Sequence, residues 1–317
     1  MIVTVTLNPS LDRTLRVPEL VVGEVLRVAE TRTDPGGKGV NVSRALEAHG
    51  TATRAVLPVG GAVGTALTAL LAKAGVDAVA VPVAGASRSN VTVVEPDGTT
   101  TKLNEPGPEL SALEIDAVVA AATRDLGAGD WVVAAGSITP GAPDDVYARL
   151  ADAAHARGAR IALDSSGEAF KAGLAASPDL VKPNNLELGE LLGRTLGSLG
   201  EVREGCEQLV ADGVGTVLCS LGADGALLVR ADGAWYGRGP KVAVRNTVGA
   251  GDSLLAGYLH ALVGGASAPD ALREGLAWAA AAVSTLGTGV PPTELIRPEE
   301  VVISTTFDSA QRLEDAA

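Results

Sequence analysis

The residues best suited to chemistry on a phosphate lie in one short segment, Thr247-Val248-Gly249-Ala250-Gly251-Asp252. A helical pattern from Leu254 to Leu262 follows directly. Glycines just before a helix let backbone N–H groups converge on an anion, and the helix dipole adds a favourable potential for phosphate. The pattern therefore predicts an anion hole over Gly249, Ala250 and Gly251. The alternative is an ordinary capped helix, because a carboxylate such as Asp252 is favourable in a first turn in any case.

A second segment is also rich in glycine and also opens a predicted helix, Pro35-Gly36-Gly37-Lys38-Gly39-Val40-Asn41. Its glycines allow a polar ligand to approach the backbone closely, and Lys38 and Asn41 add specific donors. The alternative is a plain glycine turn. Gly39 follows Lys38 where a Walker A loop requires Ser or Thr, and neither segment contains the G-x-G-x-x-G dinucleotide fingerprint. A Walker A site is therefore excluded and an oxidoreductase is disfavoured.

Three further segments place polar side chains just after predicted strands. Asp12 can accept hydrogen bonds from sugar hydroxyls, or it is a turn residue beside Asn8-Pro9. Asn184 and Glu187 can organise a hydrated Mg²⁺, or they begin a helix with a glutamate in its first turn. The segment from Ser220 to Gly225 is either a nucleotide-facing loop or a plain strand connection.

Composition and charge exclude several other functions. The 317-residue chain is 46% hydrophobic and only 3% aromatic, so Ala, Val and Leu must build most of its core. Its net charge of −13, with no run of Lys and Arg, repels nucleic acid and anionic membranes. An anionic small substrate would therefore need a few cations concentrated in one pocket.

Cysteines, histidines and apolar runs favour a cytoplasmic protein. Cys206 and Cys219 lack metal-ligand spacing and are predicted core residues, and none of the 3 histidines occupies a convincing site. The segment from Met1 to Leu7 has no cationic leader, so we expect no signal peptide. No apolar stretch reaches the ~20 residues that span a bilayer. Neither a membrane nor nucleic acid is an expected partner.

Strand-like and helix-like patterns alternate along most of the chain. The predicted strands cover residues 2–7, 53–59, 131–135, 160–163, 180–181 and 216–220. The predicted helices cover residues 42–49, 64–74, 112–126, 144–156 and 201–212. This alternation is typical of right-handed βαβ units and predicts a mostly parallel sheet covered on both faces.

Two stretches, residues 15–33 and 76–103, break the alternation and resemble short strands. The second contains a hairpin signal, Pro96-Asp97-Gly98. We predict that these strands form a small separate sheet. Such a sheet can cover, as a lid, the carboxyl ends of the parallel strands, where open α/β sheets bind their ligands.

Five segments in this order resemble those of the ribokinase-like carbohydrate kinases, and in particular the phosphofructokinase-B branch: residues 6–12, 36–41, 182–187, 220–225 and 247–252. The resemblance covers nearly the whole chain. It implies a three-layer α/β/α core with a mostly parallel sheet, in a single domain over residues 1–317, with lid strands inserted at about 13–34 and 76–104. It also implies ATP and Mg²⁺ as cofactors, a small sugar phosphate as substrate, and a homodimer formed through the lid sheet.

The same resemblance implies a role for each matching residue. Asp252 matches the catalytic base, and the backbone of Gly249, Ala250 and Gly251 matches the anion hole. The residues that match sugar-phosphate contacts are Asp12, Gly37, Lys38, Asn41, Arg88, Asn90 and Ser137, with Arg27 and Lys102 as lesser candidates. The residues that match the Mg-ATP side are Lys182, Asn184, Glu187, Ser220, Gly222, Gly225 and Thr247, with Asn184 and Glu187 holding Mg²⁺ through water.

The choice of substrate rests on fewer residues. Fructose 1-phosphate, which would give fructose 1,6-bisphosphate, ranks ahead of tagatose 6-phosphate and fructose 6-phosphate. Thr92 stands where 1-phosphofructokinases often have Lys, and residues 104–108 are also similar to the tagatose-6-phosphate enzymes. A ribose or nucleoside kinase would lack several of the site cations. A non-catalytic sugar-phosphate sensor is the alternative of another class, since a fold does not fix a function.

Overall fold

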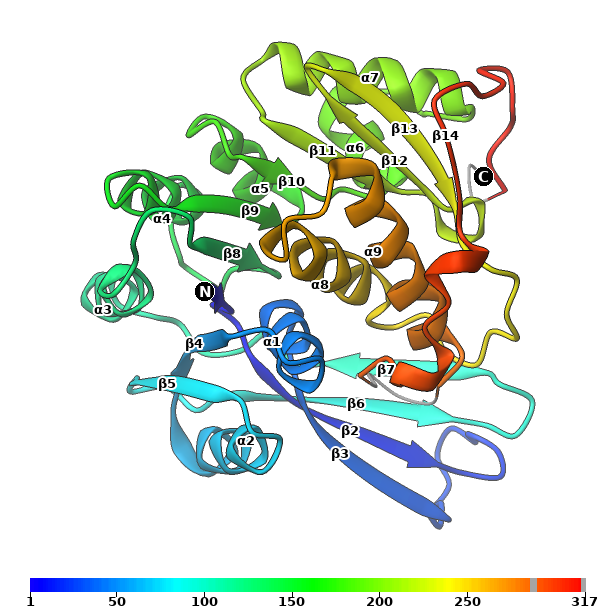
Figure 1. Cartoon of the computed structure of the whole chain (residues 1–317). Helices are drawn as coiled ribbons and strands as arrows, with labels where there is room; N and C mark the ends of the chain where they lie inside the picture. Colours follow the sequence, from blue (N-terminus) through cyan, green and yellow to red (C-terminus); the bar gives the residue numbers. More distant parts are fainter. Residues whose placement is uncertain (286–289, 315–317) are drawn as a thin grey trace.

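The large sheet is the framework of the molecule and lies between two layers of helices (Figure 1). A computed structural model describes residues 1–285 and 290–314. Within them the strand order is β14-β13-β12-β11-β10-β9-β8-β1-β4-β5. Neighbouring strands are parallel from one edge of the sheet inward, in the order β5, β4, β1, β8, β9, β10 and β11. The remaining strands, β12, β13 and β14, are antiparallel to their neighbours. The bounds of all these strands are β1 Ile2–Val5, β4 Thr53–Val59, β5 Asp77–Pro82, β8 Trp131–Ala135, β9 Arg160–Asp164, β10 Leu180–Val181, β11 Thr216–Ser220, β12 Ala226–Arg230, β13 Gly233–Arg238 and β14 Val302–Ser304.

Helices cover both faces of this sheet. α1, α8 and α9 share one buried apolar cluster with the sheet, and α3, α4, α5 and α7 share the cluster on the opposite face. The helices are α1 Lys38–Ala48, α2 Gly61–Lys73, α3 Ala112–Thr123, α4 Val146–His155, α5 Gly167–Leu174, α6 Asn185–Leu192, α7 Leu199–Ala211, α8 Ala250–Val263 and α9 Ala268–Val283. Short 3₁₀ turns are η1 Gly222–Asp224, η2 Thr293–Leu295 and η3 Pro298–Glu300.

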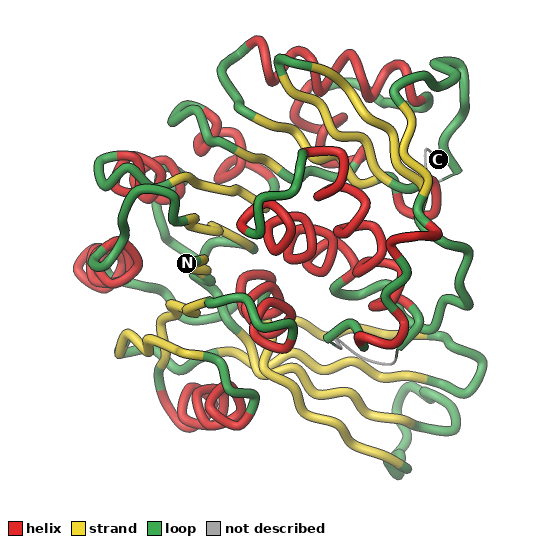
Figure 2. Tube along the Cα trace, in the orientation of Figure 1, coloured by secondary structure: helices red, strands yellow, loops and turns green. Residues whose placement is uncertain are grey.

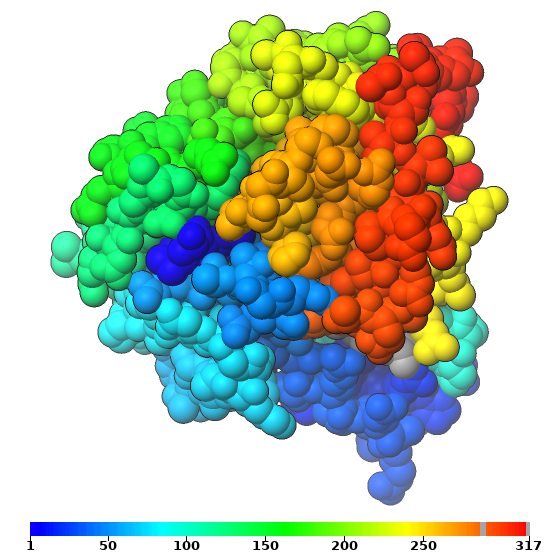
Figure 3. All heavy atoms as spheres, in the orientation of Figure 1, coloured from blue at the N-terminus to red at the C-terminus, as the bar shows by residue number. Residues whose placement is uncertain are grey.

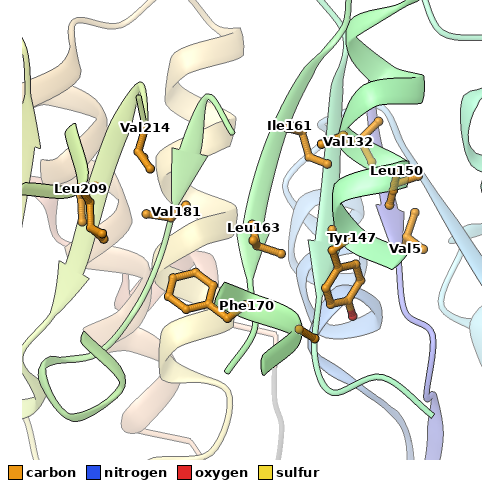
Figure 4. Close-up of a cluster of buried hydrophobic side chains, with 14 of the residues drawn as sticks. Val5, Val132, Tyr147, Leu150, Ile161, Leu163, Phe170, Val181, Leu209 and Val214 are labelled. Atoms are coloured by element: carbon orange, nitrogen blue, oxygen red, sulfur yellow. The ribbon is translucent and has the colours of Figure 1, made fainter. Parts of the chain in front are cut away.

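The central strands are apolar on both faces. Along β8, Trp131 and Val133 belong to the cluster under α1, α8 and α9, whereas Val132 and Ala134 belong to the opposite cluster. Figure 4 shows part of that opposite cluster, where Val132 lies beside Leu150 of α4. Successive side chains of a strand point to opposite faces, so a strand buried on both sides must be apolar at every position. The continuous apolar runs in the sequence therefore mark the parallel strands correctly.

A second, four-stranded sheet extends from one end of the core, in the order β3-β2-β6-β7 (Figure 2). Its strands are β2 Ser10–Arg16, β3 Glu30–Gly36, β6 Arg88–Val94 and β7 Thr100–Asn104. β6 and β7 form the predicted hairpin, with Gly98 in the left-handed region at φ 93°. We call this four-stranded sheet the lid.

One part of the lid prediction is wrong at its boundary. β5, expected among the lid strands, pairs in parallel with β4 at the edge of the large sheet. Its six residues alternate too briefly for periodicity to separate an edge strand of the core from a lid strand. The other predicted elements are present with shifted ends, and α1 begins at Lys38 instead of Val42. Within the described residues, no helix is long and apolar enough to cross a membrane.

Close packing of α8 against α9 fixes the helix that carries Asp252. A Cβ added at Gly257 of α8 would lie 2.7 Å from Cγ of Trp278 and 3.0 Å from Cα of Gly275, both in α9. These distances are shorter than side chains tolerate, so glycine at position 257 lets the two helices approach each other.

We expect Gly257→Ala to lower the free energy of unfolding by about 1–3 kcal/mol, because overpacking outweighs the roughly 1 kcal/mol that alanine gains in a helix. Urea denaturation measures the change. Gly127→Ala is the control, since its new Cβ would come no closer than 3.9 Å to another atom. Equal stability of the two variants would show that the α8–α9 contact yields without cost.

Candidate active site

Polar residues collect beyond the carboxyl ends of neighbouring parallel strands. Thr6 follows β1, Gly136 follows β8, Asp164 ends β9 and Lys182 follows β10. These strands are adjacent in the sheet. The carboxyl ends of parallel strands meet at one edge, which is where ligands bind in open α/β sheets. The candidate site is therefore at this edge, beside the lid.

Asp252 lies in the first turn of α8 and is 7% exposed. The preceding Gly249 is the N-cap, with φ 83°, and makes no side-chain cap hydrogen bond. Helix termini leave their first N–H groups without helical partners, so the start of α8 can receive an anion as the glycine pattern predicts. From α1, Asn41 donates a hydrogen bond from Nδ2 to Oδ2 of Asp252 over 2.8 Å.

A fully buried carboxylate, Asp164, lies between two lysines. Its Oδ1 is 2.8 Å from Nζ of Lys38, and its Oδ2 is 3.1 Å from Nζ of Lys182. Lys38 is the first residue of α1, whereas Lys182 is almost fully buried after β10. Nζ of Lys182 would be 3.1 Å from a Cβ added at Gly251, so this cation lies against the first turn of α8. The Lys38–Asp164–Lys182 cluster therefore connects the glycine-rich segment at the start of α1 with the one at the start of α8.

These charges shift one another's protonation. Burial raises the pKa of Asp252 to about 6, the negative charge of Asp164 adds to the rise, and Asn41 and the two lysines oppose it. Burial alone would also raise the pKa of Asp164, but Lys182 and Lys38 hold it below its ordinary value. Burial disfavours the charge on Lys38, yet Asp164 and Glu187 raise the pKa of Lys38 above its ordinary value. The pKa of Asp252 is therefore closer to neutral pH than that of an ordinary aspartate.

The glycine segment lets the backbone pass close to side chains from β1 and β2. Gly37, at φ 112°, is the single residue between β3 and α1. A Cβ on Gly36 would lie 2.1 Å from Oδ2 of Asp12, and a Cβ on Gly39 would lie 2.5 Å from Oγ1 of Thr6. Neither position can hold a larger residue without moving a polar side chain of the site. Glycine at these positions is therefore required by the close packing of the segment against Asp12 and Thr6.

Asp12 and Asn90 lie opposite each other on the paired strands β2 and β6. Oδ1 of Asp12 accepts hydrogen bonds from Oγ of Ser10 at 2.7 Å and from Nδ2 of Asn90 at 3.0 Å. Both predicted sugar contacts therefore belong to the lid, on the end nearest the core, and they hold each other in place.

Arg88 begins β6 and links two loops. Its Nε donates to the carbonyl of Asn8 at 3.2 Å, and its Nη1 donates to the carbonyl of Glu105 at 3.1 Å. Nδ2 of Asn8 in turn donates to the carbonyl of Pro106 at 3.0 Å. Arg88 thus brings a cation to the lid side of the site, and part of its donor capacity is used by the protein.

Several buried oxygens at this edge have no hydrogen-bond partner within the described residues. They are Oγ1 of Thr6, Oδ1 of Asn8, Oδ1 of Asn41, Oδ1 of Asn90 and Oγ1 of Thr139. An unpaired buried polar atom costs free energy, so water or a ligand is the expected partner of these atoms. Acceptors and hydroxyls of this kind suit the hydroxyl groups of a sugar.

Asn184 and Glu187 form a capping box at the start of α6. The backbone N–H of Asn184 donates to Oε2 of Glu187 at 2.9 Å, and the N–H of Glu187 donates to Oδ1 of Asn184 at 2.7 Å. The helix-start alternative is therefore realised. Oε1 of Glu187 also lies 3.9 Å from Nζ of Lys38, so the carboxylate still faces the site. No group of three or more His, Cys, Asp or Glu side chains in the described part of the chain could hold a metal alone.

The loop from Ser220 to Gly225 also reaches this edge. Ser220 pairs with Asn184 in an isolated parallel bridge. Gly225 has φ 100°, and a Cβ there would lie 2.0 Å from the carbonyl of Gly237. Thr247 is exposed in the turn that leads into Gly249.

Three other predicted residues differ in their placement. Ser137 is exposed. A Cβ added at its neighbour Gly136 would lie 3.8 Å from Cβ of Lys38, and the Gly136 carbonyl accepts hydrogen bonds from Tyr147 and Ser165. By contrast, Arg27 lies in the exposed loop between β2 and β3, and Lys102 lies on the outer strand β7. The contacts described above do not include these two side chains.

Sequence reasoning missed Asp164. The available signal was an aspartate at the end of an apolar strand, followed by Ser165-Ser166-Gly167. A carboxylate at the carboxyl end of a buried parallel strand has no reason to be there unless cations or a ligand meet it. The pattern does not say which lysines those are, because they are distant in sequence.

Backbone N–H groups at a helix start, two lysines and a carboxylate that can accept a proton suit the transfer of a phosphoryl group to a hydroxyl. This chemistry defines the class of phosphotransferases with an alcohol acceptor. The profile of the pfkB family carbohydrate kinases matches residues 5–295, and the chain belongs to this family. Membership of a kinase family implies ATP as the phosphoryl donor. The family and the α/β fold predicted from the five segments are thus confirmed.

Individual relatives are similar over nearly the whole chain. A 1-phosphofructokinase from Rhodobacter capsulatus is 43% identical over 298 residues, which cover 92% of this chain and 93% of that protein. Phosphofructokinase-2 from Escherichia coli, solved with fructose-6-phosphate, has a TM-score of 0.85 at 34% identity and covers 89% of this chain and 93% of its own. The same protein has a tetrameric inhibited form, with a TM-score of 0.85 at 35% identity and 89% and 93% coverage. Ribokinase from Arabidopsis thaliana shares the fold, with a TM-score of 0.73 at 23% identity and 90% and 93% coverage.

We expect Asp164→Asn to lower kcat and to move the acid limb of the pH profile to lower pH. Asp252 must be ionised to accept a proton, so the wild-type rate should fall as the pH drops through about 6. Loss of the Asp164 charge removes one cause of the raised pKa of Asp252 and leaves both lysines to lower it further. Breaking the buried pairs should also cost roughly 3–5 kcal/mol of stability.

The measurement is kcat against pH, alongside thermal unfolding of each variant. Asp77→Asn is the control, because it removes an exposed carboxylate at the outer edge of the large sheet. An acid limb that stays at the same pH in Asp164→Asn would contradict the electrostatic coupling.

Proposed function

We propose that this protein transfers the γ-phosphoryl group of ATP to the free hydroxymethyl oxygen of fructose 1-phosphate, giving fructose 1,6-bisphosphate and ADP. The observation that carries the proposal is the buried Asp252 carboxylate at the start of α8, bound by Asn41 and flanked by two lysines. The relative named 1-phosphofructokinase supports the choice of sugar phosphate.

Asp252 acts as the base in this proposal. Asn41 binds Oδ2, which leaves Oδ1 to face the hydroxyl of the substrate. Phosphoryl transfer passes through a loose transition state, so the carboxylate need only orient the hydroxyl and accept its proton as the new P–O bond forms. With a pKa of about 6, Asp252 is ionised at neutral pH and still basic enough for that step.

The cations and N–H groups of the site hold the transferred group. The backbone of Gly249, Ala250 and Gly251 would donate to its oxygens, and each such donor in other enzymes is worth roughly 3 kcal/mol. Lys182 lies against the first turn of α8, and Lys38 lies at the other oxygen of the Asp164 carboxylate. Both lysines would add positive charge near the transferred group.

Nucleotide binding is proposed for the side of the site formed by α6 and the loop after β11. Thr247, Lys182 and the loop containing Ser220, Gly222 and Gly225 would receive ATP. Mg²⁺ bound with ATP supplies neutralisation of phosphate charge, and one or two carboxylates suffice to hold it. Glu187 with Asn184 would hold it through water, which fits a site where these side chains also cap a helix.

The lid side would bind the sugar. Asp12 and Asn41 lie where hydroxyl groups can reach them, beside Gly37 and near the unpaired oxygens of Asn90 and Thr6. Arg88 and Lys38, with Ser137 in the loop beside Gly136, would meet the phosphate of the sugar. Arg27 and Lys102 reach the sugar only if the lid or a second subunit brings them closer. A guanidinium suits bidentate recognition of phosphate.

We also propose that the lid forms a homodimer contact. We further propose that the protein is located in the cytoplasm, where the free, buried Cys206 and Cys219 stay reduced. Val22 and Val25 are each 96% exposed on the loop between β2 and β3, and Leu103 of β7 is 61% exposed. Exposed apolar side chains and an edge strand such as β7 suit association with another chain. Light scattering should give a dimer that Val22→Asp/Val25→Asp converts to monomers, and a monomeric wild type would contradict the contact.

The substrate is tested by coupled ADP release with Mg-ATP and five acceptors. They are fructose 1-phosphate, fructose 6-phosphate, tagatose 6-phosphate, fructose and ribose. We expect fructose 1-phosphate to lead by at least about tenfold in kcat/KM, roughly 1.4 kcal/mol of discrimination, and both unphosphorylated sugars to be poor. A different leading phosphosugar would reassign the substrate, and binding without turnover of any acceptor would favour the sensor.

Asp252→Asn tests the base. We expect kcat to fall by roughly 10²–10⁴-fold, with KM for both substrates little changed. Because burial raises the pKa of Asp252 from 3.8 to about 6, wild-type stability falls as the pH rises through that window. The asparagine variant should therefore be up to about 3 kcal/mol more stable than wild type at pH 8 and no more stable below pH 4. Near-normal turnover would remove Asp252 as the base.

A further inference from the structure

The loop between β11 and β12 is tied to residues near the end of the described chain. Asp224 of η1 is only 5% exposed, and its Oδ2 accepts a hydrogen bond from the backbone N–H of Glu314 at 2.8 Å. Its carbonyl accepts a second hydrogen bond from the hydroxyl of Tyr236 at 2.7 Å. The Asp224 residue of this glycine-bounded loop is therefore held from two directions.

The Tyr236 hydroxyl joins three segments. It donates to Asp224 and accepts from Nε of Arg238 at 2.9 Å and from Nε2 of Gln311 at 3.2 Å. A phenol oxygen with one donor and two acceptor bonds is saturated. Its ring is buried and meets the ring of Phe307 edge-on at a centroid distance of 5.8 Å. Loop, β13 and chain end thus share one network.

Residues 309–313 are themselves firmly docked. The carbonyl of Ser309 accepts from the N–H of Gly200 at 2.9 Å, and the carbonyl of Gln311 accepts from the N–H of Leu199 at 3.0 Å, both at the start of α7. Leu313 is buried in the core. In Figure 3 the red atoms at the chain's end form the upper right edge of the molecule, beside yellow atoms. We call residues 307–314 the C-terminal brace.

We propose that the C-terminal brace is a positioning element for the nucleotide: through Tyr236 and Asp224 it holds residues 222–225 in the shape that receives ATP. The proposal rests on the proposed function, which places ATP at this loop. The brace lies beyond residues 5–295, which the family profile matches.

The physical reason is the freedom of the loop. Gly222 and Gly225 adopt φ 59° and 100°, and glycine gives a chain access to many other conformations. A ligand that binds one conformation loses apparent affinity in proportion to the fraction of time that conformation is absent. Ties to Asp224, one of the two residues between these glycines, keep that fraction low. The sugar side, built on β1 and the lid, does not share these ties.

Tyr236→Phe removes the shared hydroxyl and keeps the buried ring. We expect KM for ATP to rise about threefold to tenfold, as the loss of one or two hydrogen bonds gives, with KM for the sugar phosphate changed less than about twofold. Gln311→Ala, which removes only the donor from the brace, should raise KM for ATP in the same direction by a smaller factor. Ser309→Ala is the matched control, because Ser309 contacts α7 through its carbonyl.

Thermal unfolding shows whether each variant is folded, and calorimetric titration with ATP repeats the comparison without turnover. Weaker ATP binding by Tyr236→Phe and Gln311→Ala supports the brace even if none of the sugars is phosphorylated, an outcome that would count against the proposed function alone. If Tyr236→Phe does not fold, Gln311→Ala decides. Unchanged ATP binding in the folded variants, or equal losses for ATP and sugar phosphate, would overturn the positioning role.

Discussion

A carboxylate without access to solvent, Asp164, is the constraint on which the rest of the site depends. A buried charge is tolerated only when opposite charges meet it, and here the lysines come from segments far apart in the chain. Lys38 lies three residues before Asn41 on α1, so fixing the lysine also turns the amide toward Asp252. Glu187 approaches Lys38 from α6. The capping box, Asp252 and both glycine segments are thus positioned around one buried carboxylate.

The same arrangement resolves a conflict of charge. A chain with a net charge of −13 repels a phosphorylated sugar and a nucleotide. Around Asp164, however, two lysines meet one carboxylate whose pKa they hold below its ordinary value, and Arg88 adds a further cation on the lid side. The two lysines and Arg88 therefore supply cations at this edge of a chain that is acidic as a whole.

The sequence predicted the structure well where a residue pattern is compatible with only one kind of element. Buried parallel strands are apolar throughout, so the sheet was predictable, and the glycines before α8 marked where that helix begins. The edge strand β5 was misassigned because its exposure is mixed and its pattern is short. Asp164 was missed because its partners are set by the fold, over a separation of 126 residues from Lys38. Asn184 and Glu187 fit two descriptions at once, and the structure realises the capping one.

The connection from β3 to α1 is very short. One residue, Gly37, separates the last residue of a lid strand from the helix that carries Lys38 and Asn41. A rigid strand joined to a rigid helix by one link acts as a lever, so a tilt of the lid is passed to the first turn of α1. The Asn41 amide that donates to Asp252 lies on the same helix, so a tilt of the lid would also move the hydrogen-bond partner of that buried carboxylate.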